Sequence, residues 1–155
     1  MRRKIEMPHL EPVPGTNNYR LLDDWWVWLP VSKKWLLIKA GFVFDGASIP
    51  WFLWSVVGNP WDPNWVAEAL AHDGLYAAEL VEKHRADKEL FHLMKQGTKK
   101  ARDNARYFFI AVDDFGDAVW AKHTARSIAE ARTYCSLSDA GPVPPIPEQE
   151  QPQLV

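Results

Sequence analysis

Three side chains suited to acid–base chemistry lie close together in the segment Leu70–Tyr76. If this segment is helical, successive residues turn by about 100°, so Tyr76 lies about 40° from His72 and Asp73 lies about 100° from it. An imidazole, a phenol and a carboxylate would then share one side of a helix. This side would lie between an apolar face and a hydrated face that carries three charged residues, Glu68, Glu79 and Lys83.

Asp87 lies on a second predicted helix, over residues 86–96, in the middle of an apolar stripe. An unpaired carboxylate in such a stripe would be costly, so Asp87 should have a hydrogen-bond partner. The connection between the two helices is short, at residues 83–85, which makes them antiparallel neighbours. His72 and Tyr76 are therefore the expected partners of Asp87.

This group is typical of a general base. A neutral imidazole oriented by a buried carboxylate is suited to taking a proton from water. We therefore predict His72, Asp87 and Tyr76 as catalytic residues.

Asp73 points in a different direction and predicts a site for a hard cation such as Ca²⁺. This ion prefers carboxylate and backbone carbonyl oxygens, and glycine turns expose such carbonyls. The predicted ligands are Asp73, the backbone of Gly58 and Asp45, although Asp45 is alternatively the cap of its Asp-Gly turn. A cation beside a water held by a base is suited to ester hydrolysis. No organic cofactor is expected.

A purely structural role is the alternative for the same residues. A tyrosine that donates to an aspartate on the next helix is a common way to fasten two helices. His72, Asp73, Tyr76 and Asp87 would then form a buried polar network without catalysis. The spacing alone leaves both possibilities open.

The segment Ala67–Phe91 resembles the active-site helix pair of secreted phospholipases of the A-two type, especially the short viral ones in parvovirus capsid proteins. The matching residues are His72-Asp73-Gly74-Leu75-Tyr76 and Asp87, with Leu90-Phe91 after them. The resemblance implies that His72 activates water, Asp73 binds calcium, Asp87 orients His72 and Tyr76 bonds Asp87. The glycine-rich calcium loop of that family is replaced by residues 57–60, and the disulfides of the secreted enzymes are absent.

A longer stretch, over roughly residues 20–120, resembles an uncharacterised family of short proteins encoded by tailed phages and prophages. The motifs are the run Gly41–Pro50, which contains Asp-Gly-Ala-Ser-Ile-Pro, then Ala71–Tyr76, Arg85–Asp87 and Phe115-Gly116. This resemblance implies a viral origin but brings no activity with it.

Two strand-like segments precede these helices. Residues 19–29 and 34–44 are rich in aromatic and branched side chains, and residues 30–33 form a plausible turn between them. Asp23-Asp24 interrupts the first segment. A lone hairpin is marginally stable in water, so it should pack on helices.

The Asp45-Gly46 turn ends the second strand-like segment. Ser48 then predicts the N-cap of a short helix over residues 51–57, with Pro50 in its first turn. Gly46, Ser48 and Pro50 are thus turn and cap residues. Ser48 is not predicted as a nucleophile because it lacks a flanking glycine elbow.

Helices dominate the rest of the chain. Asp62-Pro63 predicts the start of a helix that runs to residue 82, and residues 101–132 predict one or two further helices with a break at Phe115-Gly116. Three other histidines, His84, His92 and His123, show no metal-ligand spacing with His72.

The length of 155 residues predicts one globular domain at residues 18–136, preceded by an extended arm at 1–17 and followed by a proline-rich disordered tail at 137–155. Eight of the nine tryptophans lie between Trp25 and Trp65, and we expect them to pack in the core and at its rim. The single cysteine, Cys135, excludes an internal disulfide.

Charge and hydropathy exclude several classes of partner. The net charge of −2 gives no basic field for nucleic acid. No signal peptide and no apolar run of about 20 residues are evident. Possible partners are a lipid or membrane surface, or other virion proteins, and the expected location is the host cytoplasm or the virion.

The predicted fold class is α+β, with a small N-terminal antiparallel β-hairpin or sheet on a helical body centred on an antiparallel helix pair. The leading functional hypothesis is a phage-encoded, calcium-assisted hydrolase of lipid esters with a phospholipase-like site. A non-enzymatic phage structural or accessory protein and a metal-dependent cell-wall or peptide hydrolase are the alternatives.

Overall fold

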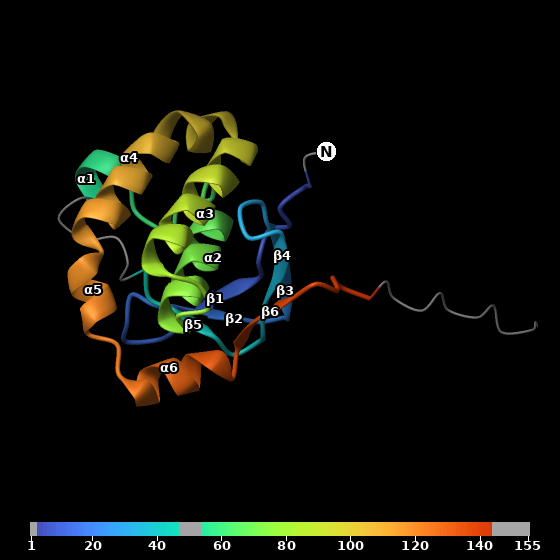
Figure 1. Cartoon of the computed structure of the whole chain (residues 1–155). Helices are drawn as coiled ribbons and strands as arrows, with labels where there is room; N and C mark the ends of the chain where they lie inside the picture. Colours follow the sequence, from blue (N-terminus) through green and yellow to red (C-terminus); the bar gives the residue numbers. More distant parts are fainter. Residues whose placement is uncertain (1–2, 47–53, 144–155) are drawn as a thin grey trace, which may run out of the picture.

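The computed structural model describes residues 3–46 and 54–143 (Figure 1). Within these ranges the fold is α+β, as predicted, with five strands before residue 45, helices from residue 54 and a sixth strand near the end. Ser48 and Pro50, predicted as cap residues, lie outside the described residues.

The strands form two small antiparallel sheets. One sheet has the order β1-β2-β5 and the other has the order β3-β4-β6. Their bounds are Leu10–Pro12 for β1, Tyr19–Leu21 for β2, Trp25–Leu29 for β3, Lys34–Ile38 for β4, Val43–Phe44 for β5 and Cys135–Ser138 for β6. The segment 1–17 therefore contributes a strand, and Leu137 and Ser138, which were predicted to lie in the tail, form part of β6.

Each of the two strand-like segments divides between the two sheets. The first segment is interrupted at Asp23-Asp24, where the Asp24 carboxylate accepts a hydrogen bond of 2.9 Å from the Ala40 backbone. The second is interrupted at Gly41, whose φ of 94° is accessible mainly to glycine. The expectation of a single hairpin is therefore incomplete, because local turns redirect both segments.

The β3–β4 hairpin has one buried and one half-buried face. Side chains alternate across a strand, and here Trp25, Val27 and Leu29 point into the core while Trp26 and Trp28 do not. The predicted turn at residues 30–33 is present and is closed by a 2.9 Å hydrogen bond from Lys33 N to Leu29 O.

The helices are α1 (Trp54–Val57), α2 (Val66–Ala77), α3 (Lys83–Gln96), α4 (Lys99–Phe115), α5 (Asp117–Ala121) and α6 (Ala125–Arg132). α2 starts later than the predicted Pro63 because residues 62–65 form a turn, in which Asp62 accepts from the Asn64 backbone at 2.9 Å. It ends earlier than residue 82 because Glu79 has a left-handed φ of 43°, and Leu80 N bonds back to Leu75 O at 3.3 Å. The predicted break at Phe115-Gly116 is where α4 ends.

α2 lies at the centre of the fold, with α3 and α4 on one side and the sheets on the other (Figure 1). Every residue from Val66 to Tyr76 is buried. This corrects the expectation that Glu68 lies on a hydrated face, since Glu68 is only 5% exposed. Residues of the N-terminal segment and of the α3–α4 connection lie around Glu68, on the face that periodicity assigned to water.

Candidate functional site

Asp87 is the centre of a buried hydrogen-bond network between α2 and α3. His72 Nε2 lies 2.8 Å from Asp87 Oδ1, and the Tyr76 hydroxyl donates to the same oxygen at 3.0 Å. Lys83 Nζ donates to Asp87 Oδ2 at 2.9 Å. The predicted partners of Asp87 are therefore its partners in the structure, and the exposed fractions of His72, Tyr76 and Asp87 are 1%, 2% and 0%.

Lys83 extends this network to a third helix. Its Nζ also donates to the backbone oxygens of Val112 at 3.0 Å and Asp113 at 3.2 Å, and it lies 3.3 Å from Asp117 Oδ1. Sequence reasoning placed Lys83 on the hydrated side, because it took the second helix to begin at residue 86. The spacing of four residues between Lys83 and Asp87 was the available signal, since such pairs lie on one helix face.

The pKa directions follow from these contacts. Burial acts to raise the pKa of Asp87, but the hydrogen bonds and charges of His72 and Lys83 outweigh it, so the pKa lies below its usual value of 3.8. Burial and the Asp87 charge raise the pKa of Tyr76. Asp87 is thus a buried carboxylate, held charged by its partners.

Asp73, which follows His72 on α2, has a different partner. Its carboxyl group is hydrogen-bonded to Asp45, which follows β5. Burial raises the pKa of Asp73 well above 3.8, and the charge and the hydrogen bond of the neighbouring Asp45 raise it further. The structure therefore joins two of the predicted metal ligands, which lie far apart in the sequence.

A cleft of about 350 Å³ opens beside this carboxyl pair. Its polar lining consists of Asp45, Asp73, Tyr76, Lys122 and His123. Its apolar lining consists of Phe42, Val43, Ala77 and Val119. His72 is not among the lining residues, so the buried imidazole is separated from the cleft by its neighbours.

His123 is the histidine that meets the cleft. Its Nδ1 lies 2.9 Å from Glu79 Oε1, and its ring lies against those of Trp120 and Tyr76, with centroids 5.5 Å and 6.4 Å away. An ionised carboxylate accepts from Nδ1–H, which leaves Nε2 as the basic nitrogen. Sequence reasoning tested His123 only for metal-ligand spacing with His72, and no local signal brings it to Tyr76.

Gly58 and Gly46 take other places. Gly58 has a φ of 102° and packs against the Trp65 ring. It is not among the residues that line the cleft. Gly46 has a φ of 64° and packs against Pro60 and Trp61. Gly46 thus has the left-handed backbone expected at a turn, whereas the role of Gly58 as a backbone ligand beside Asp73 stays a prediction.

A cation at this site would have few protein ligands. Within residues 3–46 and 54–143, no group of three or more His, Cys, Asp or Glu side chains is arranged to hold a metal ion. The Asp45–Asp73 pair offers carboxylate oxygens to a hard cation, and the cleft offers room for water and substrate oxygens. The donor set fits an ion that keeps much of its hydration.

Residues 19–112 match the model of a family described as a protein of unknown function, DUF1353. The chain belongs to the DUF1353 family. The matched segment of DUF1353 contains the carboxyl pair and the Asp87 network, while His123 and Lys122 lie beyond it. No curated protein and no solved structure matches the chain.

The lengths and compositions of the helices of this DUF1353 protein bear on whether any of them could span a membrane. None of those in residues 3–46 and 54–143 has both the length and the apolar composition needed to cross a bilayer.

Proposed function

We propose that the protein is a hydrolase whose reaction centre is the Asp45–Asp73 carboxyl pair. The observation that carries this proposal is the placement of a hydrogen-bonded carboxyl pair in the wall of a cleft of about 350 Å³. A buried carboxyl group with a raised pKa, such as Asp73, beside a second carboxyl group in a cleft is suited to proton transfer or to binding a divalent cation.

A hard divalent cation such as Ca²⁺ would bind at this carboxyl pair. Asp45 and Asp73 would hold it, with water and substrate as the remaining ligands. When bound, such an ion polarises a carbonyl and lowers the pKa of bound water. The carboxyl groups themselves fix where the ion and the reacting carbonyl lie.

His123 is the proposed general base, in place of the predicted His72. It combines the two features that a base needs: a place in the cleft wall and a carboxylate, Glu79, that orients its ring at 2.9 Å. His72 instead supports α2 from within through Asp87. The imidazole–carboxylate arrangement expected at His72 is thus repeated at a position that substrate reaches.

The cleft lining suits an ester that has an apolar part and an anionic part. Phe42, Val43 and Val119 provide an apolar wall, and the ammonium group of Lys122 stands beside it. A lipid ester with an anionic headgroup combines these two features. This supports the phospholipase-like substrate class over a peptide or a cell-wall polymer, which would need a longer groove.

The test is hydrolysis of a fluorogenic phospholipid in mixed micelles, with and without Ca²⁺. We expect Ca²⁺-dependent hydrolysis that falls by about 100-fold or more in Asp73→Asn and in His123→Gln. Matched controls are Asp103→Asn and His92→Gln, which change exposed residues on α4 and α3 and should retain full activity. An inactive wild type whose melting temperature does not respond to Ca²⁺ would refute the proposal.

A non-enzymatic phage structural or accessory protein is the second candidate. Its support is the burial of the Asp87 network, since His72 at 1% exposure has the character of a structural residue. For this candidate, Asp87→Asn should lower the melting temperature strongly, Ca²⁺ should leave it unchanged, and His123→Gln should have no functional consequence.

We also propose a phage origin, on the resemblance of Gly41–Pro50 and Ala71–Tyr76 to proteins of tailed phages and prophages. A lipid surface or other virion proteins would then be the partners, in the host cytoplasm or the virion. Co-purification of the protein with phage particles would test the virion location.

A further inference from the structure

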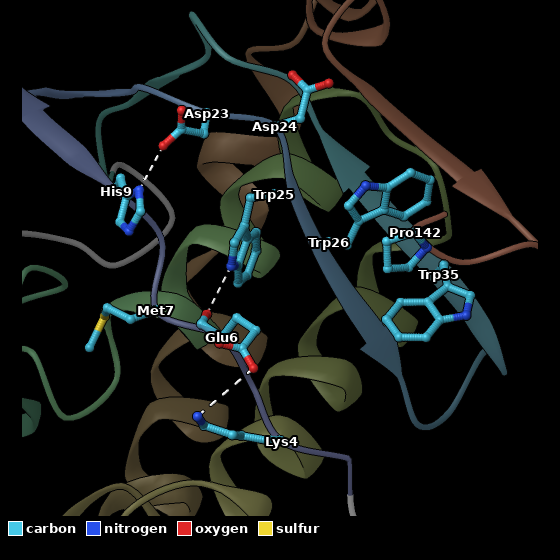
Figure 2. Close-up of a pocket in the computed structure, with 10 residues that line it drawn as sticks. All are labelled: Lys4, Glu6, Met7, His9, Asp23, Asp24, Trp25, Trp26, Trp35 and Pro142. Carbon is cyan, nitrogen blue, oxygen red and sulfur yellow. Dashed lines mark hydrogen bonds and ion pairs between the residues drawn. The ribbon is translucent and has the colours of Figure 1, made fainter. Parts of the chain in front are cut away.

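A second and larger cleft, of about 650 Å³, is formed by other residues than those of the proposed reaction centre. It lies between the N-terminal segment, residues 4–9, and strand β3 (Figure 2). Its lining includes three tryptophans and three carboxylates, Trp25, Trp26, Trp35, Glu6, Asp23 and Asp24. None of these residues lines the Asp45–Asp73 cleft.

The cleft follows the outer edge of β3. Successive side chains of a strand point to opposite faces, so a cavity that touches both Trp25 and Trp26 must pass along the edge between them. β3 is also the terminal strand in the order β3-β4-β6, and no strand of the described residues pairs with its outer side. Figure 2 shows Trp25 directed towards Glu6, with Trp26 and Trp35 beyond the strand.

The tryptophan face of this sheet already holds a guanidinium group. The Arg3 Cζ lies 4.4 Å from the centroid of the Trp28 ring and 5.0 Å from that of Trp35. A cation over an indole ring is attracted by its negative face. Trp35 belongs both to this arginine contact and to the wall of the cleft.

The charges that surround the cleft favour a cation. Asp23, Asp24 and Glu6 contribute three carboxylates, whereas Lys4 is the one lysine in the lining. The side chains of Asp23 and Glu6 are each 69% exposed, so a ligand in the cleft can reach them. His9 Nδ1 lies 2.6 Å from Asp23 Oδ2, which leaves the other Asp23 oxygen available.

We propose that this cleft binds an extended, arginine-bearing segment of a partner protein. The backbone of the segment would lie along the open edge of β3, as in strand addition. A guanidinium group of the segment would stack on Trp26, and its guanidinium groups would pair with Asp23 and Glu6. Planar guanidinium suits this combination better than ammonium, because it both stacks and donates in a fork.

The test uses a fluorescein-labelled peptide with two arginines separated by one glycine, so that both side chains point to the same side of a strand. Fluorescence polarisation with the full chain measures its dissociation constant. We expect the lysine counterpart to bind about 3- to 10-fold more weakly, and the neutral citrulline counterpart to bind more than about 10-fold more weakly. Binding should weaken as salt is raised.

Two variants locate the site. The double variant Glu6→Gln/Asp23→Asn should bind the arginine peptide about 10-fold more weakly. Its matched control, Asp103→Asn/Glu130→Gln, removes the same charge from exposed positions on α4 and α6 and should bind as the wild type does. Trp26→Leu should reduce the preference for arginine over lysine, and the carboxylate variants decide the matter if that variant does not fold.

The proposal is overturned if the arginine peptide does not bind, if citrulline substitutes for arginine without loss, or if Glu6→Gln/Asp23→Asn binds normally. Displacement of the peptide by a neutral oligosaccharide such as maltoheptaose would also overturn it, because the tryptophans would then serve sugar stacking. Each outcome is independent of hydrolase activity, which concerns the other cleft.

Discussion

Two buried carboxyl groups, Asp73 on α2 and Asp87 on α3, have pKa values that are shifted in opposite directions. Asp87 is 0% exposed and contacts an imidazole, a phenol and an ammonium group. Asp73 is 6% exposed, and its partner is another carboxyl group. The pKa of Asp87 is lowered and that of Asp73 is raised, so the charge of a buried carboxyl group depends on its partner.

This difference in partners suggests that Asp87 serves the stability of the fold, whereas Asp73 serves the proposed reaction. The Asp87 network is satisfied and closed, and it joins α2, α3 and α4. The Asp45–Asp73 pair brings two like groups together, joined by a hydrogen bond, and borders a cleft. Functional sites often retain such unfavourable arrangements at the expense of stability. The two carboxyl groups should therefore respond in opposite directions to the same substitution.

The largest expected effect is that of Asp87→Asn. It should lower the free energy of unfolding by about 3–5 kcal/mol, because Lys83 loses its buried counter-charge. Urea denaturation at pH 7 measures this, with Asp103→Asn as a control that should stay within about 0.5 kcal/mol of wild type. Because the folded pKa of Asp87 is below its unfolded value of 3.8, its stabilisation is present above that pH and is lost on further acidification. An unchanged stability would contradict the assignment of Asp87 as a charged structural centre.

Glu68 provides a third carboxyl group for the comparison. Burial raises its pKa from 4.5 to about 7. Because the folded pKa is the higher one, the stability that Glu68 contributes is complete below pH 4.5 and is lost as the pH rises through about 7. The change corresponds to about 3 kcal/mol. We therefore expect Glu68→Gln to be more stable than wild type at pH 8 by up to this amount, and the advantage to vanish at pH 4. Thermal unfolding of both proteins across this range is the measurement.

Asp73→Asn should stabilise the protein at pH 8, by about 1–3 kcal/mol, because an amide has no buried charge. The folded pKa of Asp73 lies above its unfolded value of 3.8, so wild-type stability falls as pH rises through the folded pKa, and the variant should lack this fall. Chemical denaturation of the wild type and of Asp73→Asn, each at pH 5 and at pH 8, measures this difference in pH dependence. A destabilised Asp73→Asn at pH 8 would show that Asp73 is a structural carboxylate like Asp87.

Tyr76→Phe should have the smallest effect, a loss of about 1 kcal/mol. It removes one hydrogen bond of 3.0 Å to Asp87 but leaves those from His72 and Lys83 in place. The ring keeps its contact with Trp120, at a centroid distance of 5.1 Å. Denaturation of Tyr76→Phe beside Asp87→Asn measures how far the network tolerates the loss of one donor, and a loss as large as that of Asp87→Asn would show that the hydroxyl is indispensable.

Much of the α2–α3 arrangement follows from local rules. The burial of Asp87 in an apolar stripe required a partner, and helical spacing put His72 and Tyr76 on the same side. The α+β class, the turn at residues 30–33 and the break at Phe115-Gly116 follow from similar local signals. The contact of Lys83 with Asp87 was not predicted, because the predicted start of the second helix lay three residues after the start of α3. Lys83 was therefore not placed on the same helix as Asp87.

The cleft could not be derived in this way. His123 and Lys122 lie on the loop after α5, and only the packing of that loop against α2 and β5 brings them to Asp73. β6 pairs with β4 and joins the second sheet from the end of the described chain. Local periodicity in the sequence does not predict long-range pairing of this kind.

The sequence by itself determined the pairing of Asp87 with His72 and Tyr76, since residues on adjacent helices joined by a short connection have few places to go. Only the tertiary structure decided which of the candidate groups meet solvent. It closed His72 inside the fold and opened a cleft at Asp73, because access depends on what distant segments cover, and helical spacing carries no information about that.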